Sequence, residues 1–265
     1  MTVSAPKKFL CLCGYLQNGK IFAEKSSGIR KILTKKLNFQ LDYIDPPNKI
    51  PSKESLPFQL ADTEEEANTK WDGLVQLDIN RCWWAAHNGA NYEGFQNSLN
   101  YVMNYIQQNG PYDGIIAFSQ GAALASIVTN TIRKTLPESS YFGVSILISG
   151  FVFTEVKNPE EDDPASIHSI ENFDEYLSKI KKIDTYSDLF TPPTSKDFTT
   201  KVVIVYGEND NAVPPVRSQY LASTYNSENV KEFKHDGGHF VPNKKQFLNP
   251  IVDVISELFE KKPNL

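Results

Sequence analysis

The chain has 265 residues, 40% of them apolar and 12% aromatic, a composition typical of a folded globular protein and not of a disordered one. Its 27 basic and 32 acidic residues give a net charge of −5, so the sequence offers no broad basic field for nucleic acid or an anionic membrane. Its three cysteines form neither a disulfide framework nor a spaced metal-ligand pattern, so we expect no metal and no cofactor.

The N-terminal stretch "MTVSAPKK" does not have the pattern of a signal peptide. No run of residues approaches the roughly 18 consecutive apolar residues that a membrane-spanning helix needs. From the sequence we therefore expect a cytoplasmic protein without stable membrane insertion.

Short apolar runs alternate with helical patterns along the first half of the chain. The predicted strands cover residues 8–13, 39–47 and 113–119, and the predicted helices cover 19–37, 92–110 and 121–136. Between them, residues 48–92 are predicted to be irregular. This segment is acidic around "DTEEEAN" and contains "RCWWAAHNG".

The same alternation continues in the second half. The predicted strands cover residues 142–150, 201–210 and 229–238, and the predicted helices cover 169–180, 213–225 and 244–262, the last broken or kinked by Pro250. This order predicts one α/β domain over residues 1–265, with a mostly parallel sheet flanked by helices. Residues 48–92 and 151–199 are the candidate cap segments.

Functional residues of such sheets lie at the carboxyl ends of the strands, and "IIAFSQGAALA" places Ser119 at one of them. The window from Ala117 to Gly121 fits the nucleophile elbow G-x-S-x-G, with Ala in the first small position. Small residues permit the sharp turn, and the helix that follows aims its N–H groups at a developing oxyanion. By itself the window also fits a serine that merely caps a helix.

An acid and a base follow later strands. Asp210 ends the strand in "VYGENDNAVPP" and His239 follows the last strand in "HDGGHFVP", which gives the order of an α/β-hydrolase triad. His239 would take the proton of Ser119, and Asp210 would hold the imidazole in the useful tautomer. Glu208 is the alternative acid. His235 is the alternative base, but only His239 follows a Gly-Gly loop that can bring it over the sheet edge.

Two backbone N–H groups are needed for an oxyanion hole, and we expect them from Gln120 and Tyr15, with Leu16 as the alternative to Tyr15. An apolar acyl or alkyl pocket is expected beside them. Its candidate residues are Leu16, Trp83, Trp84, Phe118 and Phe151. The two tryptophans also fit a simpler role as anchors that tie their loop to the core.

Four stretches of the chain together resemble a known family: "GYLQNGKIFAEKSSGIRK", "NGPYDGIIAFSQGAALAS", "VYGENDNAVPPVRS" and "HDGGHFVPNKK". They are similar to the family serine hydrolases (FSH) of fungi and to the related human ovarian-tumour-suppressor-candidate hydrolase. The resemblance covers essentially the whole chain and implies an α/β-hydrolase with Ser119, Asp210 and His239 as the triad. It also implies esterase or thioesterase activity, since some fungal members release polyketide chains from carrier proteins.

The sequence departs from that family after the first strand, where Cys13-Gly14 replaces the usual His-Gly. That histidine is not the catalytic base, and we expect it to brace the oxyanion loop by hydrogen bonding. A thiol is a weak donor, so reduced activity or altered specificity is expected here. Cys13 as a second nucleophile is the less favoured interpretation, because no base stands beside it in the sequence.

The sequence thus predicts a metal-independent serine hydrolase that cleaves a small-molecule ester or thioester with an apolar chain through an acyl-enzyme. One alternative is a thioesterase or acyltransferase acting on a carrier-bound acyl or polyketide chain. Another is a weakly active or non-catalytic homologue, because of Cys13. A nucleotide-binding protein is disfavoured, since neither G-x-G-x-x-G nor GK[ST] follows any predicted strand.

Overall fold

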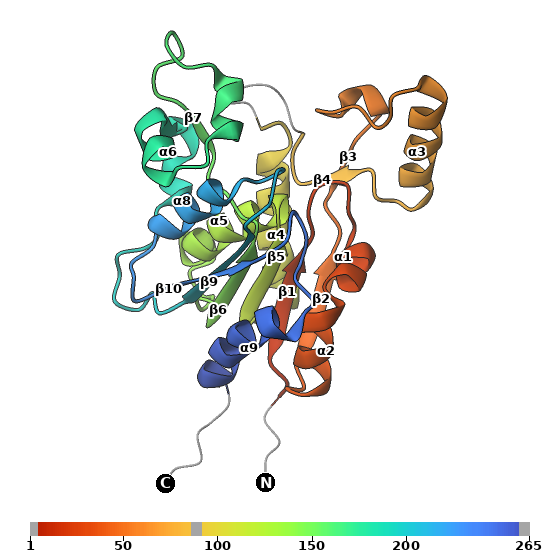
Figure 1. Ribbon diagram of the computed structural model, residues 1–265. Coiled ribbons are helices and arrows are strands. Elements are labelled where there is room, and N and C mark those ends of the chain that lie inside the picture. Colours follow the sequence, from red (N-terminus) through yellow and green to blue (C-terminus); the bar gives the residue numbers. More distant parts are fainter. Residues whose placement is uncertain (1–4, 86–91, 260–265) are drawn as a thin grey trace.

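Six parallel strands form the central sheet, in the spatial order β10-β9-β6-β5-β1-β2 (Figure 1). The computed structural model describes residues 5–85 and 92–259. The strands are β1 Lys8–Leu12, β2 Gln40–Ile44, β5 Gly114–Phe118, β6 Val144–Ile148, β9 Lys201–Gly207 and β10 Val230–His235. Every residue of β5 and β6 is buried, which explains why these two strands have unbroken apolar sequences. The predicted parallel α/β architecture is confirmed.

Helices cover both faces of this sheet (Figure 1). One face carries α1 Gly19–Lys25, α2 Ser27–Lys35 and α9 Lys245–Phe259, and the other carries α4 Phe95–Asn109, α5 Gln120–Thr135 and α8 Pro215–Ser223. Because βαβ crossovers in one sheet share a hand, the chain changes face where the strand order reverses, between β1 and β5. Ligand sites of open α/β sheets lie at such a reversal.

Two long insertions lie beyond the carboxyl ends of the strands (Figure 1). The first contains β3 Asn48–Lys49, the 3₁₀ turn η1 Lys53–Ser55, α3 Glu64–Gln76 and β4 Arg81–Cys82. The second contains β7 Thr154–Val156, η2 Pro164–Ser169, α6 Phe173–Lys179, β8 Ile180–Lys182, α7 Asp184–Ser187 and η3 Asp188–Phe190. The second has an apolar cluster of its own, which includes Tyr176 and packs on Val216 of α8.

Two predicted segments are wrong in detail. Residues 19–37 form two helices and not one, because the chain turns at Ser26, whose hydroxyl donates to Phe22 O at 2.7 Å. Residues 48–92 are not irregular throughout, since α3 occupies Glu64–Gln76. Its start had a readable signal: Thr63 accepts from the N–H of Glu66, and acidic residues fill the first turn.

The terminal helix was predicted to break or kink at Pro250. In the structure α9 continues from Lys245 to Phe259 with Pro250 inside it, so no break occurs. Its buried face, which includes Ile251 and Ile255, packs against the core and keeps the helix in place despite the missing N–H of the proline.

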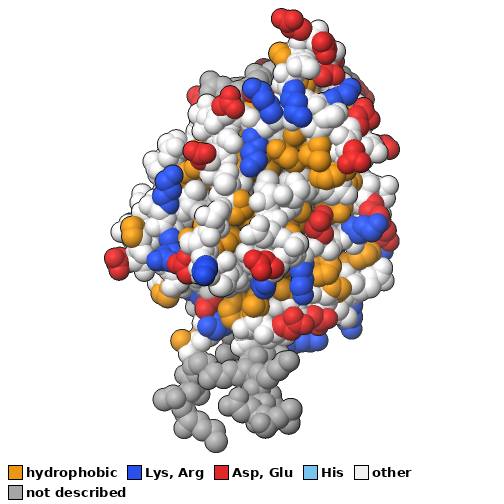
Figure 2. Space-filling view, turned by 90° about the vertical axis from the view of Figure 1, so that its left-hand side faces the viewer, with side chains coloured by type: hydrophobic (Ala, Val, Ile, Leu, Met, Phe, Trp, Pro, Cys, Tyr) orange, Lys and Arg blue, Asp and Glu red, His pale blue; other side chains and the backbone are white. Residues whose placement is uncertain are grey.

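Charged side chains of both signs are interspersed on the face drawn in Figure 2, without a large patch of one sign. Hydrophobic side chains form small groups among them. In residues 5–85 and 92–259, no helix combines the length and the hydropathy that a bilayer crossing requires.

The start of α5 lies unusually close to the end of β1. A Cβ at Gly121 would stand 2.3 Å from Cys13 O and 2.7 Å from Leu12 O, both of them backbone atoms that cannot swing aside. Ala122 and Ala123 follow without any exposed surface. Small residues are therefore required where this helix meets the sheet, as the sequence indicated.

We predict that Gly121→Ala lowers the free energy of unfolding by about 1–3 kcal/mol, because the added methyl overpacks a rigid contact. Gly73→Ala is the matched control. Gly73 lies inside α3 with open space around its Cα, so the same methyl should stabilise the protein by about 0.5–1 kcal/mol. Chemical denaturation measures both changes, and equal effects would contradict the packing argument.

Candidate active site

Ser119 lies on the turn between β5 and α5 with a φ of +54° and a ψ of −121°. This left-handed conformation is strained for a residue with a side chain. The turn is held because Ser119 N donates to Ile148 O of the neighbouring strand at 2.8 Å. The strained elbow that the sequence motif predicted is therefore present, and it leaves the serine 8% exposed at the floor of a pocket.

The structure brings Ser119, His239 and Asp210 into one chain of hydrogen bonds. The distance from His239 Nε2 to Ser119 Oγ is 3.0 Å, and that from His239 Nδ1 to Asp210 Oδ2 is 2.8 Å. The three residues come from the carboxyl ends of three strands that are far apart in the sequence. Such a chain can transfer a proton from the serine hydroxyl to the imidazole while the carboxylate holds the ring.

The carboxylate of Asp210 is fully buried and surrounded by donors. Its Oδ1 accepts from the N–H groups of Ala212 and Val213, at 3.0 and 2.8 Å. Burial alone would raise the pKa of Asp210, but the hydrogen bonds from His239, Val213 and Ser149 outweigh it and lower the pKa below its usual value. The acid therefore stays ionised and can orient the imidazole.

Ser149 is a member of this network that the sequence analysis missed. It follows β6 directly, has a φ of +49°, and its hydroxyl donates to Asp210 Oδ2 at 2.9 Å. Its backbone N–H donates to Val205 O at 2.7 Å, which fixes the turn. The rule that located Asp210, a polar residue at the carboxyl end of a buried strand, would also have located Ser149.

The alternative acid and base lie elsewhere. Glu208 is paired with Lys234 Nζ at 2.6 Å on the surface. His235 is buried beside Phe240, and its Nδ1 accepts from Gly237 N at 3.2 Å. Desolvation lowers the pKa of His235, so the ring is neutral and can accept this bond. His235 thus belongs to the turn that positions His239.

The two backbone N–H groups expected to form an oxyanion hole belong to the start of α5 and to the loop after β1. Gln120 is the first residue of α5, so its N–H has no acceptor within the helix. Its side chain is fixed, with Oε1 accepting from Trp83 N and Nε2 donating to Trp84 O, both at 2.8 Å. The N–H of Leu16, the alternative to Tyr15, already donates to Arg81 O at 3.0 Å, which leaves Tyr15 as the second candidate.

Gln17 and Trp83 brace the loop that carries Tyr15. Gln17 accepts twice, from Gly14 N at 3.3 Å on Oε1 and from Cys13 Sγ at 3.5 Å on its carbonyl. Trp83 Nε1 donates to Cys13 O at 2.8 Å. The thiol contact is the longest of these bonds, so Cys13 is one brace among several. Burial also raises the pKa of the Cys13 thiol, which disfavours it as a nucleophile.

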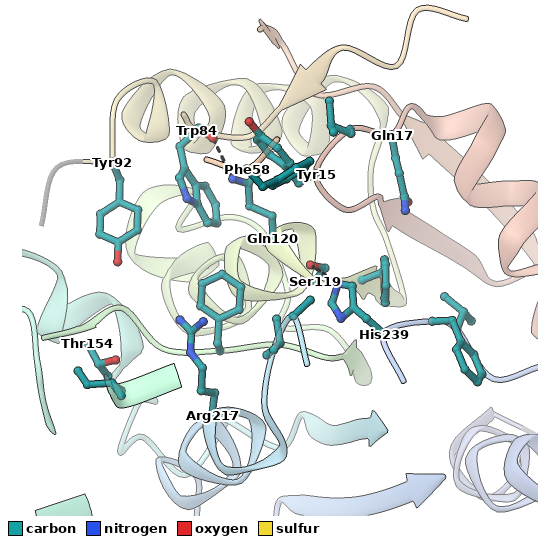
Figure 3. Close-up of a pocket in the computed structure, with 18 of the residues that line it drawn as sticks. Tyr15, Gln17, Phe58, Trp84, Tyr92, Ser119, Gln120, Thr154, Arg217 and His239 are labelled. Carbon is teal, nitrogen blue, oxygen red and sulfur yellow. Dashed lines mark hydrogen bonds between the residues drawn. The ribbon is translucent and has the colours of Figure 1, made fainter. Parts of the chain in front are cut away.

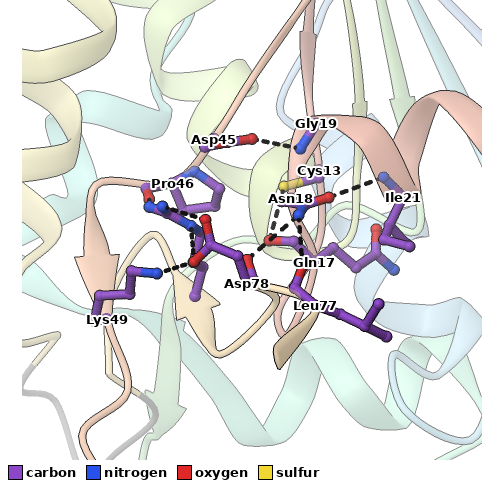
Figure 4. Close-up of polar contacts among 11 residues, drawn as sticks. Cys13, Gln17, Asn18, Gly19, Ile21, Asp45, Pro46, Lys49, Leu77 and Asp78 are labelled. Carbon is purple, nitrogen blue, oxygen red and sulfur yellow. Dashed lines mark hydrogen bonds and ion pairs between the residues drawn. The ribbon is translucent and has the colours of Figure 1, made fainter. Parts of the chain in front are cut away.

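Asn18 connects the same loop to the first insertion (Figure 4). Its Oδ1 accepts from Ile21 N and so caps α1, while its Nδ2 donates to the carbonyls of Leu77 and Asp78. Asp78 in turn pairs with Arg81, whose Nη2 lies 2.8 Å from Oδ2. The loop that carries Tyr15 is therefore tied both to α1 and to the first insertion.

A cavity of about 1440 Å³ opens above Ser119 (Figure 3). Of the predicted pocket residues, Leu16, Trp84, Phe118 and Phe151 line it. The prediction that Trp83 lines it is wrong: this side chain has no exposed surface and packs in the core, where it anchors the Cys13 carbonyl.

The sequence analysis also missed several lining residues. They come from elements whose position over the site only the fold determines: Phe58, Tyr92, Arg217, Phe240 and Val241. Phe58 and Phe240 are about half exposed, at 50% and 49%, and lie at the rim. Within the described part of the chain, no group of three His, Cys, Asp or Glu side chains is arranged to hold a metal ion.

Comparison with known proteins identifies one family. The family model described as "Serine hydrolase (FSH1)" matches residues 1–251. The chain is 28% identical to family of serine hydrolases 3 from Saccharomyces cerevisiae, over 98% of this chain and 87% of that protein. It is 26% identical to esterase OVCA2 from Danio rerio, over 90% of this chain and 92% of that protein.

Solved structures show the same fold at low identity. SOBER1 from Arabidopsis thaliana aligns over 97% of this chain and all of its own, with a TM-score of 0.54 and 15% identity. Acyl-protein thioesterase 2 from Zea mays aligns over 97% of this chain and 95% of its own, with a TM-score of 0.54 and 13% identity. This likeness supports the fold assignment alone.

We predict that Ser149→Ala lowers kcat/KM for ester hydrolysis about five- to tenfold, because Asp210 loses a donor worth about 1–1.5 kcal/mol. Ser126→Ala is the matched control, since that buried hydroxyl donates to Ala123 O at 2.7 Å, inside α5. Both variants lose one buried hydrogen bond. Equal kcat/KM values for the two variants would contradict the role given to Ser149.

Proposed function

The chain belongs to the serine hydrolase (FSH1) family, and we propose that it cleaves small-molecule carboxylic esters and thioesters with Ser119 as the nucleophile. The observation that carries this proposal is the continuous chain of hydrogen bonds from Ser119 through His239 to the ionised Asp210. It lies at the floor of a cavity large enough for an acyl chain, since ligand pockets are commonly about 300–1,000 Å³.

In the first half of the reaction, His239 Nε2 takes the proton of Ser119 as Oγ attacks the carbonyl carbon. The negative charge that develops on the carbonyl oxygen is stabilised by the N–H groups of Gln120 and Tyr15. The bond from the carbonyl carbon to the leaving oxygen or sulfur then breaks. His239 gives its proton to that atom, and the acyl group stays on Ser119.

In the second half, water replaces the leaving group. His239 takes a proton from the water as the water oxygen attacks the acyl carbon, and the same N–H groups stabilise the second oxyanion. The bond to Ser119 Oγ breaks, Oγ recovers its proton from His239, and the carboxylic acid is released. No metal or cofactor takes part in this sequence of steps.

The replacement of the family histidine by Cys13 bears on whether this machinery works. Three hydrogen bonds hold the oxyanion loop without the thiol. Trp83 Nε1 donates to Cys13 O, Gly14 N donates to Gln17 Oε1, and Leu16 N donates to Arg81 O. These bonds support an active enzyme over a non-catalytic homologue.

The pocket walls indicate what the acyl group is. Trp84 lies in edge-to-face contact with Phe151, with ring centroids 6.4 Å apart, and both line the cavity. Together with Leu16 and Phe118 they form an apolar surface beside Ser119. We take the insertions at 48–92 and 151–199 as the cap over this pocket, because Phe58 and Ile167 of these segments line it. Residues 86–91 lie outside the described part of the chain.

Cysteine chemistry supports a reducing, cytoplasmic setting. Cys11, Cys13 and Cys82 are all free thiols, and all are buried in the core. A chain that folds with three unpaired thiols is typical of a reducing compartment.

We predict that a fluorophosphonate probe labels the wild-type protein covalently at neutral pH and does not label Ser119→Ala. The probe reacts only with a serine that a base has activated. Circular dichroism of both proteins is the control that they are folded. Absence of labelling in a folded wild-type protein would remove the hydrolase proposal, including the weakly active form of it.

We also predict that p-nitrophenyl esters of medium or longer acyl chains are hydrolysed with higher kcat/KM than the acetate ester. Each methylene that the aromatic wall buries contributes about 0.8 kcal/mol, so the increase should continue over several carbons. A series that peaks at acetate would contradict the apolar acyl pocket.

A further inference from the structure

Arg217 brings a positive charge into this otherwise aromatic wall. It lies on α8, is half-buried, and lines the same cavity as Ser119. Its guanidinium carbon lies 4.3 Å from the centroid of the Phe151 ring, a stacking contact that orients the planar group without using its N–H donors. Figure 3 shows the side chain reaching from α8 toward Trp84 and Tyr92.

The guanidinium of Arg217 has no protein acceptor among the residues that the structure describes. The other three arginines of the chain each donate to a protein oxygen: Arg30 to Ala23, Arg81 to Asp78, and Arg133 to Asp197. Among the described residues, the guanidinium of Arg217 has only its stacking contact with Phe151. A guanidinium carries five N–H donors, so those of Arg217 are available to a ligand in the cavity.

Three carboxylates line the cavity as well, those of Glu24, Glu155 and Asp163, and none neutralises Arg217. Glu155 pairs with Lys181 Nζ at 3.1 Å. Asp163 is exposed and has contacts of its own. In the described part of the chain, none of the three forms an ion pair with Arg217.

Local structure does not explain an arginine at this position. Arg217 stands in the first turn of α8, directly after Pro215 and Val216, where the helix dipole disfavours a cation. No acidic residue shares that turn. The positive charge of Arg217 is thus unfavourable for α8, yet it lies where it lines the pocket. A locally unfavourable residue at a pocket points to a ligand.

The position of Arg217 relative to His239 indicates which part of the substrate it meets. His239 delivers the proton to the leaving group, so the leaving group lies on its side of Ser119. In Figure 3, Ser119 lies between His239 on one side and Trp84, Tyr92 and Arg217 on the other. The acyl chain therefore extends from Ser119 along Trp84 and Phe151 toward Arg217.

We propose that this enzyme accepts acyl chains that end in a carboxylate, and that Arg217 binds this distal carboxylate. This inference rests on the proposed esterase function and names the substrate class. The aromatic side chains contact the methylene groups, while the guanidinium donates two parallel hydrogen bonds to the carboxylate oxygens. Half-esters or half-thioesters of dicarboxylic acids meet both requirements.

The test compares matched p-nitrophenyl esters. One series carries dicarboxylic acids from adipic to sebacic acid, and the other carries monocarboxylic acids with the same number of carbons. In the wild-type protein we expect the ratio of kcat/KM, dicarboxylic over monocarboxylic, to exceed one at the length that reaches Arg217. In Arg217→Met this ratio should fall at least about tenfold, and Arg217→Lys should restore part of it. Added salt should lower the wild-type ratio.

Arg133→Met is the matched control, because Arg133 also stacks on an aromatic ring, that of Tyr141, but lies outside the pocket and is paired with Asp197. Its ratio should equal that of the wild-type protein. A wild-type ratio below one at every length, or an unchanged ratio in Arg217→Met, would overturn the inference. Loss of hydrolysis in both series would instead overturn the proposed esterase function.

A second comparison tests whether Arg217 binds the acyl chain and not the leaving group. Octanoyl thioesters of pantetheine and of 4′-phosphopantetheine differ only in an anionic group on the leaving thiol. We expect the ratio of their kcat/KM values to be the same in wild-type protein and Arg217→Met. If Arg217→Met lowers only the phosphorylated rate, Arg217 binds the leaving group and the acyl assignment is wrong.

Discussion

The close approach of α5 to the end of β1 is the constraint on which the site depends. Gly121 lies against the carbonyl of Cys13, with no room for even one methyl group. This contact places the first N–H of α5 beside the loop that carries Tyr15, directly after Ser119 and its left-handed backbone. A larger distance between α5 and β1 would relax the turn. It would also move Ser119 away from His239 and separate the N–H groups of Gln120 and Tyr15.

The loops around this contact hold one another in place. Gln120 donates and accepts through its side chain to the backbone of Trp83 and Trp84, and Trp83 returns a bond to Cys13 O. On the other side of the site, the carboxylate of Asp210 is fully buried and accepts from four donors. Ser149 is one of these donors. Ser119, His239 and the proposed oxyanion donors are therefore positioned by bonds made before any substrate binds, as electrostatic preorganisation requires.

The pocket combines apolar walls with Arg217, a half-buried cation whose guanidinium has no acceptor among the described residues. The aromatic residues explain binding of an alkyl chain, but they do not explain why Arg217 stands in the first turn of a helix. A ligand with an apolar middle and an anionic end accounts for both. Selectivity would then come from the distance between Ser119 and Arg217, which sets the chain length, together with the charge at the end of the chain.

The sequence by itself determined the sheet, most of the helices and the residues at the strand ends. Periodicity is a local property, and residues at the carboxyl ends of parallel strands must meet at one edge, so Ser119, Asp210 and His239 could be found without coordinates. Where a local signal existed, as at the Thr63 cap or at Ser149, the residue could have been found in the same way.

Only the tertiary structure decided which side chains line the pocket. Trp83 and Trp84 are adjacent and chemically identical, yet one is sealed in the core and the other faces the cavity. Arg217 and Phe58 reach the site from α8 and from the first insertion, and no local pattern gives the distance between such segments. Strand and helix patterns depend on neighbours in the sequence, whereas a pocket wall depends on how the insertions fold back over the sheet. That packing is set by long-range contacts, which the sequence does not display locally.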